Sequence, residues 1–307
     1  MLAVENIKKT YGNREVVRGV SFTVKAGESF GLLGPNGAGK STTISMISGL
    51  VGIDSGEILV DGSSVKQQPM RSKKIIGVVP QEIALYPTIS ARENLLFWGK
   101  MYGLTGKQAK NRVEEVLHII GLTERAKDKV ETFSGGMKRR VNIGAALMHE
   151  PKLLIMDEPT VGIDPQSRNH ILETVKQLNQ QGMTVIYTSH YMEEVDFLCE
   201  RVGIIDAGNV IAIGTKNELC NRLAGGTIHR IKVDHIQDSF ISQVRAIDMV
   251  TGVATTENTL EIIGAENILA DIIRLAGEQN VKVLSIEIQE PNLESLFLQL
   301  TGKTLRD

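Results

Sequence analysis

The sequence predicts an α/β protein in which a large N-terminal domain with a mainly parallel, covered sheet precedes a smaller α+β domain. Short apolar strands alternate with helical segments between residues 29 and 205, and the order of elements changes after about residue 223. Residues 1–24 instead alternate between apolar and polar side chains. Strands buried on both faces are continuous apolar runs, whereas strands with one solvated face alternate. A chain of 307 residues is also long enough for two cores.

The N-terminal elements follow from this periodicity. Residues 1–24 predict antiparallel strands. Further strands are expected at Ser29–Leu33, Glu57–Val60, Ile75–Val79, Leu153–Met156, Thr184–Thr188 and Val202–Ile205. Helices are expected from about Lys40 to Gly49 and from Gln166 to Gln180. Mostly helical spacing from about residue 90 to residue 128 predicts an inserted helical subdomain at about 88–150.

The second predicted domain, residues 223–307, has a different order of elements. We expect strands at Ile228–Val233, Met249–Thr255, Thr259–Ile263 and Val281–Ile288, and helices at Ser239–Ala246 and Glu266–Gln279. This β-α-β-β-α-β order is ferredoxin-like. A last short helix is expected at Asn292–Leu300. The domain is expected to support dimerisation or regulation; ligand sensing is the alternative, although residues 227–307 contain no cluster of site-like polar residues.

Composition limits the classes of partner. Hydrophobic residues make up 42% and charged residues 23% of the chain, and the formal net charge of −2 provides no basic surface, so no nucleic-acid partner is expected. Lys138, Arg139 and Arg140 are interpreted as a solvated helix face. No apolar run approaches the roughly 20 residues that span a bilayer. Any work at a membrane would therefore require a partner.

A glycine-rich motif between a predicted strand and a predicted helix points to a nucleoside triphosphate. The run from Gly34 to Ser41 matches G-x-x-x-x-G-K-[ST]. Its glycines let backbone N–H groups converge, and the following helix N-terminus adds positive charge. Lys40 is expected to reach the β- and γ-phosphates, and Ser41 to ligate Mg²⁺. The predicted nucleotide-binding residues here are Gly34, Pro35, Asn36, Gly37, Ala38, Gly39, Lys40, Ser41 and Thr42.

Two carboxylates at the end of another predicted strand add the means of hydrolysis. The strand Leu153–Met156 continues into Asp157 and Glu158. Asp157 can hold Mg²⁺ directly or through water. Glu158, the next residue, points in a different direction from Asp157 and can accept a proton from the attacking water. The sequence therefore predicts a P-loop NTPase fold.

The order of these motifs resembles the ATP-binding cassette (ABC) family over residues 1 to about 220. The resemblance implies that Tyr11 stacks on adenine, and that Gln81 senses the γ-phosphate and the metal and contacts a membrane partner. It makes His190, together with Glu158, a γ-phosphate contact that positions water. Asp164 lies in a segment that resembles the D-loop, which couples the sites of two subunits.

A second helix N-terminus, residues 133–137, resembles the family's LSGGQ signature motif. The resemblance implies that Ser134, Gly135 and Gly136 act on nucleotide bound by the opposite subunit. Phe133 keeps the apolar anchor of the usual leucine. Met137 replaces a polar glutamine, which puts in doubt the contacts made through that side chain but not those through Ser134 and the backbone.

The variant signature motif and the C-terminal extension resemble the ABC-2 type branch of drug and sodium exporters. The resemblance implies an ATP hydrolase that binds ATP and Mg²⁺ as a homodimer and powers a separate integral-membrane permease. It also implies a cytoplasmic subunit, peripheral on the inner face of the cell membrane. The alternative is a soluble cassette ATPase in DNA repair or translation, but the chain has no second phosphate loop and no heptads. The transported substrate cannot be deduced from the sequence.

Overall fold

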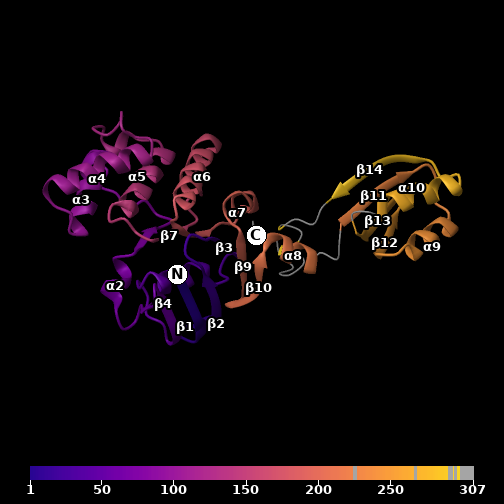
Figure 1. The fold of residues 1–307 in the computed structure, drawn as a ribbon, viewed down its shortest axis with the longest axis horizontal. Coiled ribbons are helices and arrows are strands. Elements are labelled where there is room, and N and C mark those ends of the chain that lie inside the picture. Colours follow the sequence, from indigo (N-terminus) through magenta and orange to yellow (C-terminus); the bar gives the residue numbers. More distant parts are fainter. Residues whose placement is uncertain (224–226, 266–267, 290–292, 294–295, 298–307) are drawn as a thin grey trace. The chain divides into compact units, whose positions relative to one another are not determined.

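The computed structural model describes the chain except residues 224–226, 266–267, 290–292, 294–295 and 298–307 (Figure 1). It divides into two compact units, Met1–Ile213 and a second unit that begins at Gly214. The division precedes helix α8 (Lys216–Leu223), whereas the sequence placed it at residues 222/223.

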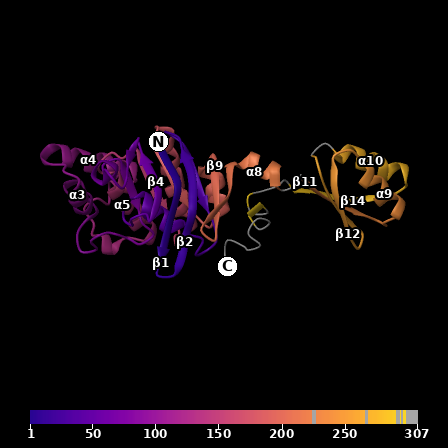
Figure 2. The ribbon, with the colours of Figure 1, turned by 90° about the horizontal axis from the view of Figure 1, so that it is seen from below.

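The first unit begins with a four-stranded sheet in the order β2-β1-β4-β5, whose first three strands are visible side by side in Figure 2. The strands are β1 (Leu2–Tyr11), β2 (Arg14–Val24), β4 (Ser55–Val60) and β5 (Ser63–Ser64). Val4 lies opposite Phe22 on one side and Ile58 on the other, and all pairs are antiparallel. The predicted antiparallel strands are confirmed, and β4 joins this sheet.

The second sheet is six-stranded, with the order β10-β9-β3-β8-β7-β6. Its strands are β3 (Ser29–Leu33), β6 (Ile76–Val79), β7 (Leu153–Asp157), β8 (Thr184–Thr188), β9 (Arg201–Asp206) and β10 (Asn209–Thr215). The pairs β3–β8, β3–β9, β6–β7 and β7–β8 are parallel. Every residue of β3 and β8 is buried, as expected for strands covered on both faces. The predicted covered parallel sheet is confirmed.

Helix α1 (Lys40–Ile47) and the two sheets enclose a common apolar core. Phe22 of the antiparallel sheet stacks on Phe30 of the parallel sheet, with ring centroids 5.2 Å apart. Met46 and Ile47 of α1 are fully buried. Burying each of these side chains contributes about 1.5–3 kcal/mol. The phosphate loop is thereby attached to a rigid base.

A helical subdomain is inserted between β6 and β7. It contains α3 (Ala91–Met101), α4 (Gly106–Ile119), α5 (Gly135–Leu147) and a short 3₁₀ helix, Val130–Thr132, and it gathers at one end of the first unit in Figure 1. A capping box starts α3, because Ser90 accepts from Glu93 N while Glu93 accepts from Ser90 N. At Gly144 the helices come close, since a Cβ there would lie 3.0 Å from Val116 and Ile120. The predicted helical insertion is confirmed.

Three further helices complete the first unit: α2 (Pro69–Lys73), α6 (Pro165–Gln180) and α7 (Met192–Leu198). Only α6 was expected from the sequence. It starts at Asp164, whose side chain accepts from Ser167 N.

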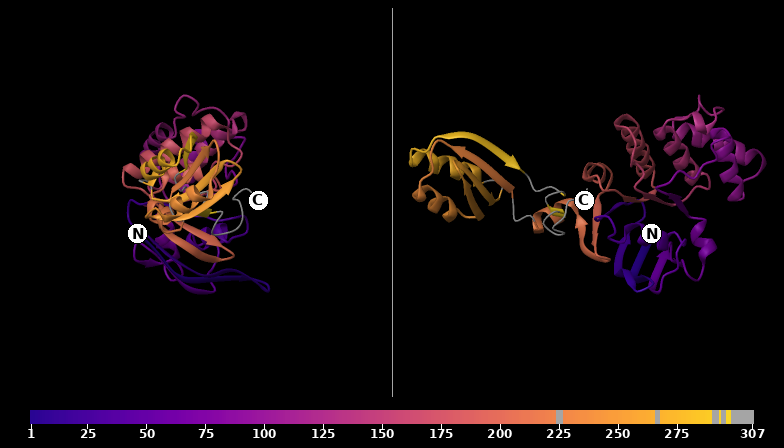
Figure 3. Two further views of the ribbon diagram at one scale, coloured as in Figure 1. Left: turned by 90° about the vertical axis from the view of Figure 1, so that its right-hand side faces the viewer. Right: turned by 180° about the vertical axis from the view of Figure 1, so that it is seen from behind.

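The second unit has a four-stranded antiparallel sheet in the order β12-β13-β11-β14, whose strands are labelled in Figure 1. The right-hand view of Figure 3 shows the same sheet from behind. Its elements are β11 (Thr227–Val233), α9 (Asp238–Ala246), β12 (Val250–Thr256), β13 (Thr259–Gly264), α10 (Leu269–Glu278) and β14 (Val283–Gln289). Ile231, Val233 and Leu260 pack with Phe240 and Ile272 of the helices. The ferredoxin-like order is confirmed. Of the helix expected at Asn292–Leu300, most residues lie outside the described part of the chain.

Candidate functional site

The phosphate loop connects the C-terminal end of β3 to the N-terminus of α1. Two glycines allow its close approach to neighbouring backbone. A Cβ at Gly34 would lie 2.3 Å from the Ile205 carbonyl oxygen. Gly39, which caps α1, has φ +105° and lies beside the Val16 carbonyl. The loop therefore curls into the cradle that the motif predicts.

Lys40 is the buried cation of this cradle. It is 5% exposed, and its Nζ donates to the carbonyls of Gly34 (2.7 Å) and Pro35 (3.2 Å). Burial lowers the pKa of Lys40, and the nearby charges of Glu158 and Asp157 oppose that shift. In contrast to Lys40, Ser41 is exposed at the start of α1. A buried ammonium aimed at a loop of backbone dipoles suits a phosphate ligand.

Glu158 lies between two nitrogen groups. Its Oε1 is 3.8 Å from Lys40 Nζ, and its Oε2 is 3.4 Å from His190 Nδ1. The residue has φ +45°, a left-handed conformation that is strained for a non-glycine residue. Its N–H donates to Thr188 Oγ1 at 2.9 Å, and this hydroxyl donates to Asp157 Oδ1 at 2.7 Å. Thr188 thus fixes both carboxylate residues where β7 and β8 end.

A cavity of about 610 Å³ opens over these groups. Three predicted residues from separate parts of the chain line it: Gln81 after β6, Glu158 after β7 and His190 after β8. Asn36 of the phosphate loop lines it as well. The carboxyl ends of adjacent parallel strands are where an open α/β sheet binds ligands.

A buried carboxylate that the sequence did not reveal orders the loop carrying His190. Glu194 is 1% exposed and accepts from Thr160 Oγ1 (2.7 Å), Tyr187 OH (2.8 Å) and Ser189 Oγ (2.7 Å). Arg168 Nε lies 3.6 Å from it. Burial, followed by the charge of Glu194, raises the pKa of Tyr187. A glutamate in a polar run has no distinctive spacing, so only the fold reveals this cluster.

Several predicted residues lie apart from the cavity. Ser134 caps α5, accepting from Met137 N at 3.3 Å, and neither it nor Gly135 nor Gly136 is among the residues that line the cavity. Asp164 is exposed and caps α6; the Ser167 N–H lowers its pKa. Tyr11 ends β1 with its ring half exposed, and its described ring contact is with Lys9, not with the phosphate loop.

The sequence and the fold both resemble those of known ATP-binding proteins. The ABC transporter family model matches residues 17–161. The linearmycin resistance ATP-binding protein LnrL of Bacillus subtilis (strain 168) is 64% identical over 311 residues, covering 100% of both chains. The chain belongs to the ABC transporter ATP-binding protein family. Like other ABC cassettes, it binds ATP with Mg²⁺ and is an ATP hydrolase.

Other relatives and solved cassettes agree. The Nod factor export ATP-binding protein I of Burkholderia orbicola (strain AU 1054) is 37% identical, covering 98% of this chain and 97% of that protein. A dimeric ATP-binding cassette in a post-hydrolysis state, bound to ADP and Pi, has a TM-score of 0.64 and 28% identity, covering 70% of this chain and 98% of that one. CbiO1 from Clostridium perfringens, part of the ABC transporter complex cbiONQ, has a TM-score of 0.66 and 29% identity over 72% of this chain and 90% of that one.

The donors of this ABC cassette fit Mg²⁺. Asp157 supplies a half-buried carboxylate and Ser41 an exposed hydroxyl, the hard oxygen ligands that Mg²⁺ prefers. Within the described ranges, no three His, Cys, Asp or Glu side chains gather into a site that could hold a metal. A Mg²⁺ ion held by Asp157 and Ser41 would therefore take further ligands from the phosphate oxygens, as Mg²⁺ sites with one or two carboxylates do.

The interpretation of Lys138–Arg140 as a solvated face is wrong for Arg139. Its side chain is 3% exposed and donates to the carbonyls of Pro80 (2.7 Å) and Gln81 (2.5 Å). Arg140 donates to the carbonyls of Ile120 and Gly121. A residue pattern on one helix cannot reveal that a distant loop will cross over it.

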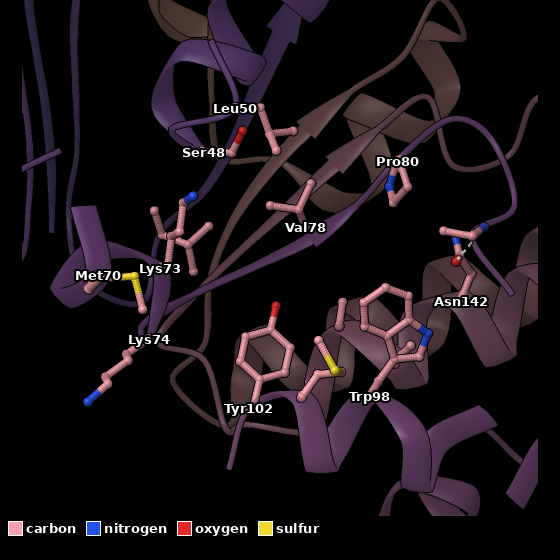
Figure 4. Close-up of a pocket in the computed structure, with 15 residues that line it drawn as sticks. Ser48, Leu50, Met70, Lys73, Lys74, Val78, Pro80, Trp98, Tyr102 and Asn142 are labelled. Atoms are coloured by element: carbon pink, nitrogen blue, oxygen red, sulfur yellow. Dashed lines mark hydrogen bonds between the residues drawn. The ribbon is translucent and has the colours of Figure 1, made fainter. Parts of the chain in front are cut away.

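A second cavity, of about 480 Å³, lies between the parallel sheet and the helical subdomain (Figure 4). It is mostly apolar, with Trp98 and Tyr102 of the helical subdomain on one side and Leu50 and Val78 on the other. Lys73 and Lys74 line its edge. Leu50 is 71% exposed. Exposed large apolar side chains around a groove mark an interaction surface.

In the described part of the chain, no helix is both long and apolar enough to cross a membrane.

Proposed function

We propose that this chain is the motor subunit of an exporter, in which ATP closes a head-to-tail homodimer and thereby drives a separate membrane permease. One observation carries the proposal. Gln81, Glu158 and His190 line one cavity, and Lys40 Nζ lies 3.8 Å from Glu158 Oε1, whereas Ser134 and Gly136 are not among the lining residues. A half-site of this kind requires a second copy that supplies helix α5, which begins with the signature residues Ser134 to Gly136 and is called the signature helix below. The subunit would work in the cytoplasm, on the inner face of the cell membrane.

Each residue has a role in that proposal. Lys40 and the loop amides would hold the β- and γ-phosphates, and Ser41, Asp157 and Gln81 would hold Mg²⁺, which when bound would supply positive charge against the phosphates. Glu158 accepts the proton of the attacking water, and His190 orients the water and the γ-phosphate. Tyr11 is assigned to adenine, and Asp164 to coupling between the two half-sites.

The groove of Figure 4 suits the permease. Its exposed apolar side chains, Leu50, Met70 and Met101, would bury the apolar face of an amphipathic helix, and Lys73 and Lys74 would pair with acidic residues of that helix. Pro80 and Ala84, which flank Gln81, also line it. Movement of the Gln81 loop would therefore be felt by a partner in the groove.

Export is favoured by the relatives, which are named for linearmycin resistance and for Nod factor export. A membrane partner is favoured by the structural neighbour that is part of an ABC transporter complex.

We propose that the second unit supports dimerisation through strand β14, an edge strand of its sheet. Leu284, Ile286 and Ile288 are 53%, 38% and 47% exposed. Antiparallel pairing of two copies about Ile286 sets Leu284 opposite Ile288, so the apolar rows join. It also sets Glu287 opposite Ser285 of the other copy, next to that copy's Lys232, its neighbour in the sheet. This charge complementarity favours a second copy as the occupant.

The replacement Glu158→Gln tests the proposed motor. The variant keeps the carboxylate's shape but cannot accept a proton, so it should bind ATP, remain closed as a dimer and lose at least about 100-fold in kcat. Light scattering with ATP and Mg²⁺ measures the dimer, and phosphate release measures turnover. Lys40→Met, which removes the phosphate contact, is the control in which adding ATP should leave the fraction of dimer unchanged. Near-wild-type turnover in Glu158→Gln would remove Glu158 from the general-base role.

A further inference from the structure

The loop from Pro80 to Tyr86, which carries Gln81, is tied to the helical subdomain by side chains alone. Each hydrogen bond that the structure shows for this loop is made with the side chain of Arg139 or Asn142 of α5 or of Asn94 of α3. No backbone–backbone bond is shown for the described residues 80–86. The loop is exposed at Gln81, Glu82 and Ala84. Its position therefore depends on a few side chains.

Arg139 makes the closest of these contacts. Its two terminal nitrogens donate to consecutive carbonyls, Pro80 O at 2.7 Å and Gln81 O at 2.5 Å. The guanidinium forms no ion pair with a carboxylate of the described residues, and its Nε lacks a hydrogen-bond partner. A buried charge satisfied chiefly by two loop carbonyls binds that loop firmly, because losing the loop leaves the charge unpaired. The rigid fork of arginine also fixes the orientation of both peptides.

Asn142 lies one turn further along α5, on the same face. Its Oδ1 accepts from Ala84 N at 3.2 Å, a bond drawn in Figure 4, and its Nδ2 donates to Glu82 O at 3.4 Å. It is 3% exposed. Together Arg139 and Asn142 hold the loop on both sides of the Gln81 side chain.

This pair lies between the two cavities of the first unit. Gln81 lines the nucleotide cavity, whereas Pro80, Ala84 and Asn142 line the apolar groove. The helix that carries the pair begins at Ser134, the signature residue. The loop, the groove and the signature helix are therefore joined through two buried side chains.

We propose that Arg139 and Asn142 are positioning residues that fasten the Gln81 loop to the signature helix α5, so that Gln81 and Ser134 of one subunit move as one body. The inference rests on the proposed function, in which Gln81 serves the subunit's own nucleotide and Ser134 serves the partner's. Closing the signature helix on one nucleotide would then set Gln81 at the other. Both sites would be committed together, because the contacts of Arg139 and Asn142 transmit the movement of the helix to the loop.

A double-mutant cycle between Arg139 and Gln81 tests the proposal in the full-length chain. Arg139→Met keeps the length of the side chain but removes its donors. We expect its kcat to fall about 10- to 100-fold through misplacement of Gln81, with the Kd for ATP changed by less than about threefold. Gln81→Ala should lose a similar factor. The double variant should match Gln81→Ala within about twofold, because a side chain that is absent cannot be misplaced.

Arg140→Met is the matched control, since Arg140 neighbours Arg139 but bonds only carbonyls of the helical subdomain among the described contacts. It should keep kcat within about twofold. If Arg139→Met does not fold, Asn142→Leu replaces it in the same cycle with the same expectation. Losses that multiply in the double variant, or wild-type kcat in Gln81→Ala or Arg139→Met, would overturn the proposal. Glu158→Gln tests the proposed motor separately. If the double-mutant cycle contradicts the role of Arg139 but Glu158→Gln still abolishes turnover, the proposed function stands.

Discussion

At the scale of single residues, position gives each carboxylate its task. Glu158 is held in a strained backbone conformation between Lys40 and His190, where it can accept a proton. Glu194 is buried and accepts three hydroxyl hydrogen bonds, which keep its charge satisfied. The same side-chain type therefore serves chemistry at one site and local order at the other.

The replacement Glu194→Ala should lower the free energy of unfolding by about 3 kcal/mol. It leaves the hydroxyls of Thr160, Tyr187 and Ser189 without their acceptor and Arg168 without its ion pair. Urea unfolding measures the loss. Glu193→Ala is the control, because Glu193 is exposed and its loss should cost less than about 0.5 kcal/mol. Equal destabilisation by the two variants would contradict the assigned role of Glu194.

Sequence could predict residues whose spacing is fixed by the ligand. The loop Gly34–Ser41 must cradle phosphates, so its residue types recur in a fixed order. Glu194 and Arg139 act through partners at distant positions, Thr160 for one and Pro80 for the other. No local pattern encodes such contacts, which exist only once β6, β7 and β8 are side by side. Arg139 was consequently assigned to solvent.

At the scale of elements, the signature helix α5 meets α6 at its first turn. A Cβ added to Gly136 would lie 2.2 Å from Ser167 Cβ and Oγ, at the start of α6. At Gly135 the nearest atom would be Ile163 Cδ1 at 3.6 Å, an ordinary contact. Gly136 is thus required by helix packing, in addition to any contact with a nucleotide.

This packing predicts different outcomes for the two signature glycines. Gly136→Ala should force α5 from α6 and lower the free energy of unfolding by about 1–3 kcal/mol, with a loss of ATPase activity. Gly135→Ala should stay within about 0.5 kcal/mol of wild type. Ser167→Gly removes the clashing side chain, so Gly136→Ala combined with Ser167→Gly should recover part of the stability. Thermal or urea unfolding of the four proteins measures the effect; no recovery would place the strain elsewhere.

Elements with strong apolar periodicity were predictable, and short polar ones were not. Strands β3, β7 and β8 are buried runs, so their existence followed from composition. The short helices α2 and α7 were missed because five or seven residues carry little periodicity. The sheet to which β4 belongs was not predicted either. Pairing is a property of the tertiary fold that a single strand does not encode.

At the scale of the whole molecule, two of the three proposed interfaces involve a second copy, and the third is the groove assigned to the permease. The nucleotide cavity lacks a signature helix from its own chain, and the edge strand β14 of the second unit has exposed apolar side chains. Two weak contacts linked in one chain reinforce each other through effective concentration. The second unit would therefore keep the cassettes near each other between rounds of hydrolysis.

Dilution of the full-length protein tests this arrangement. ATPase activity per mole should decrease once the protein concentration is below a threshold, because a monomer cannot complete the proposed composite nucleotide site. Ile286→Lys places a charge at the centre of the proposed β14 pair and should raise that threshold by at least about tenfold, equivalent to 1.4 kcal/mol, while kcat at high concentration stays unchanged. Met249→Lys, at another exposed apolar residue of the same unit, should leave the threshold in place. Activity that stays proportional to protein concentration down to demonstrably monomeric samples would contradict the composite site. If the threshold concentration exists but is the same in Ile286→Lys as in the wild type, β14 is excluded as the dimer contact.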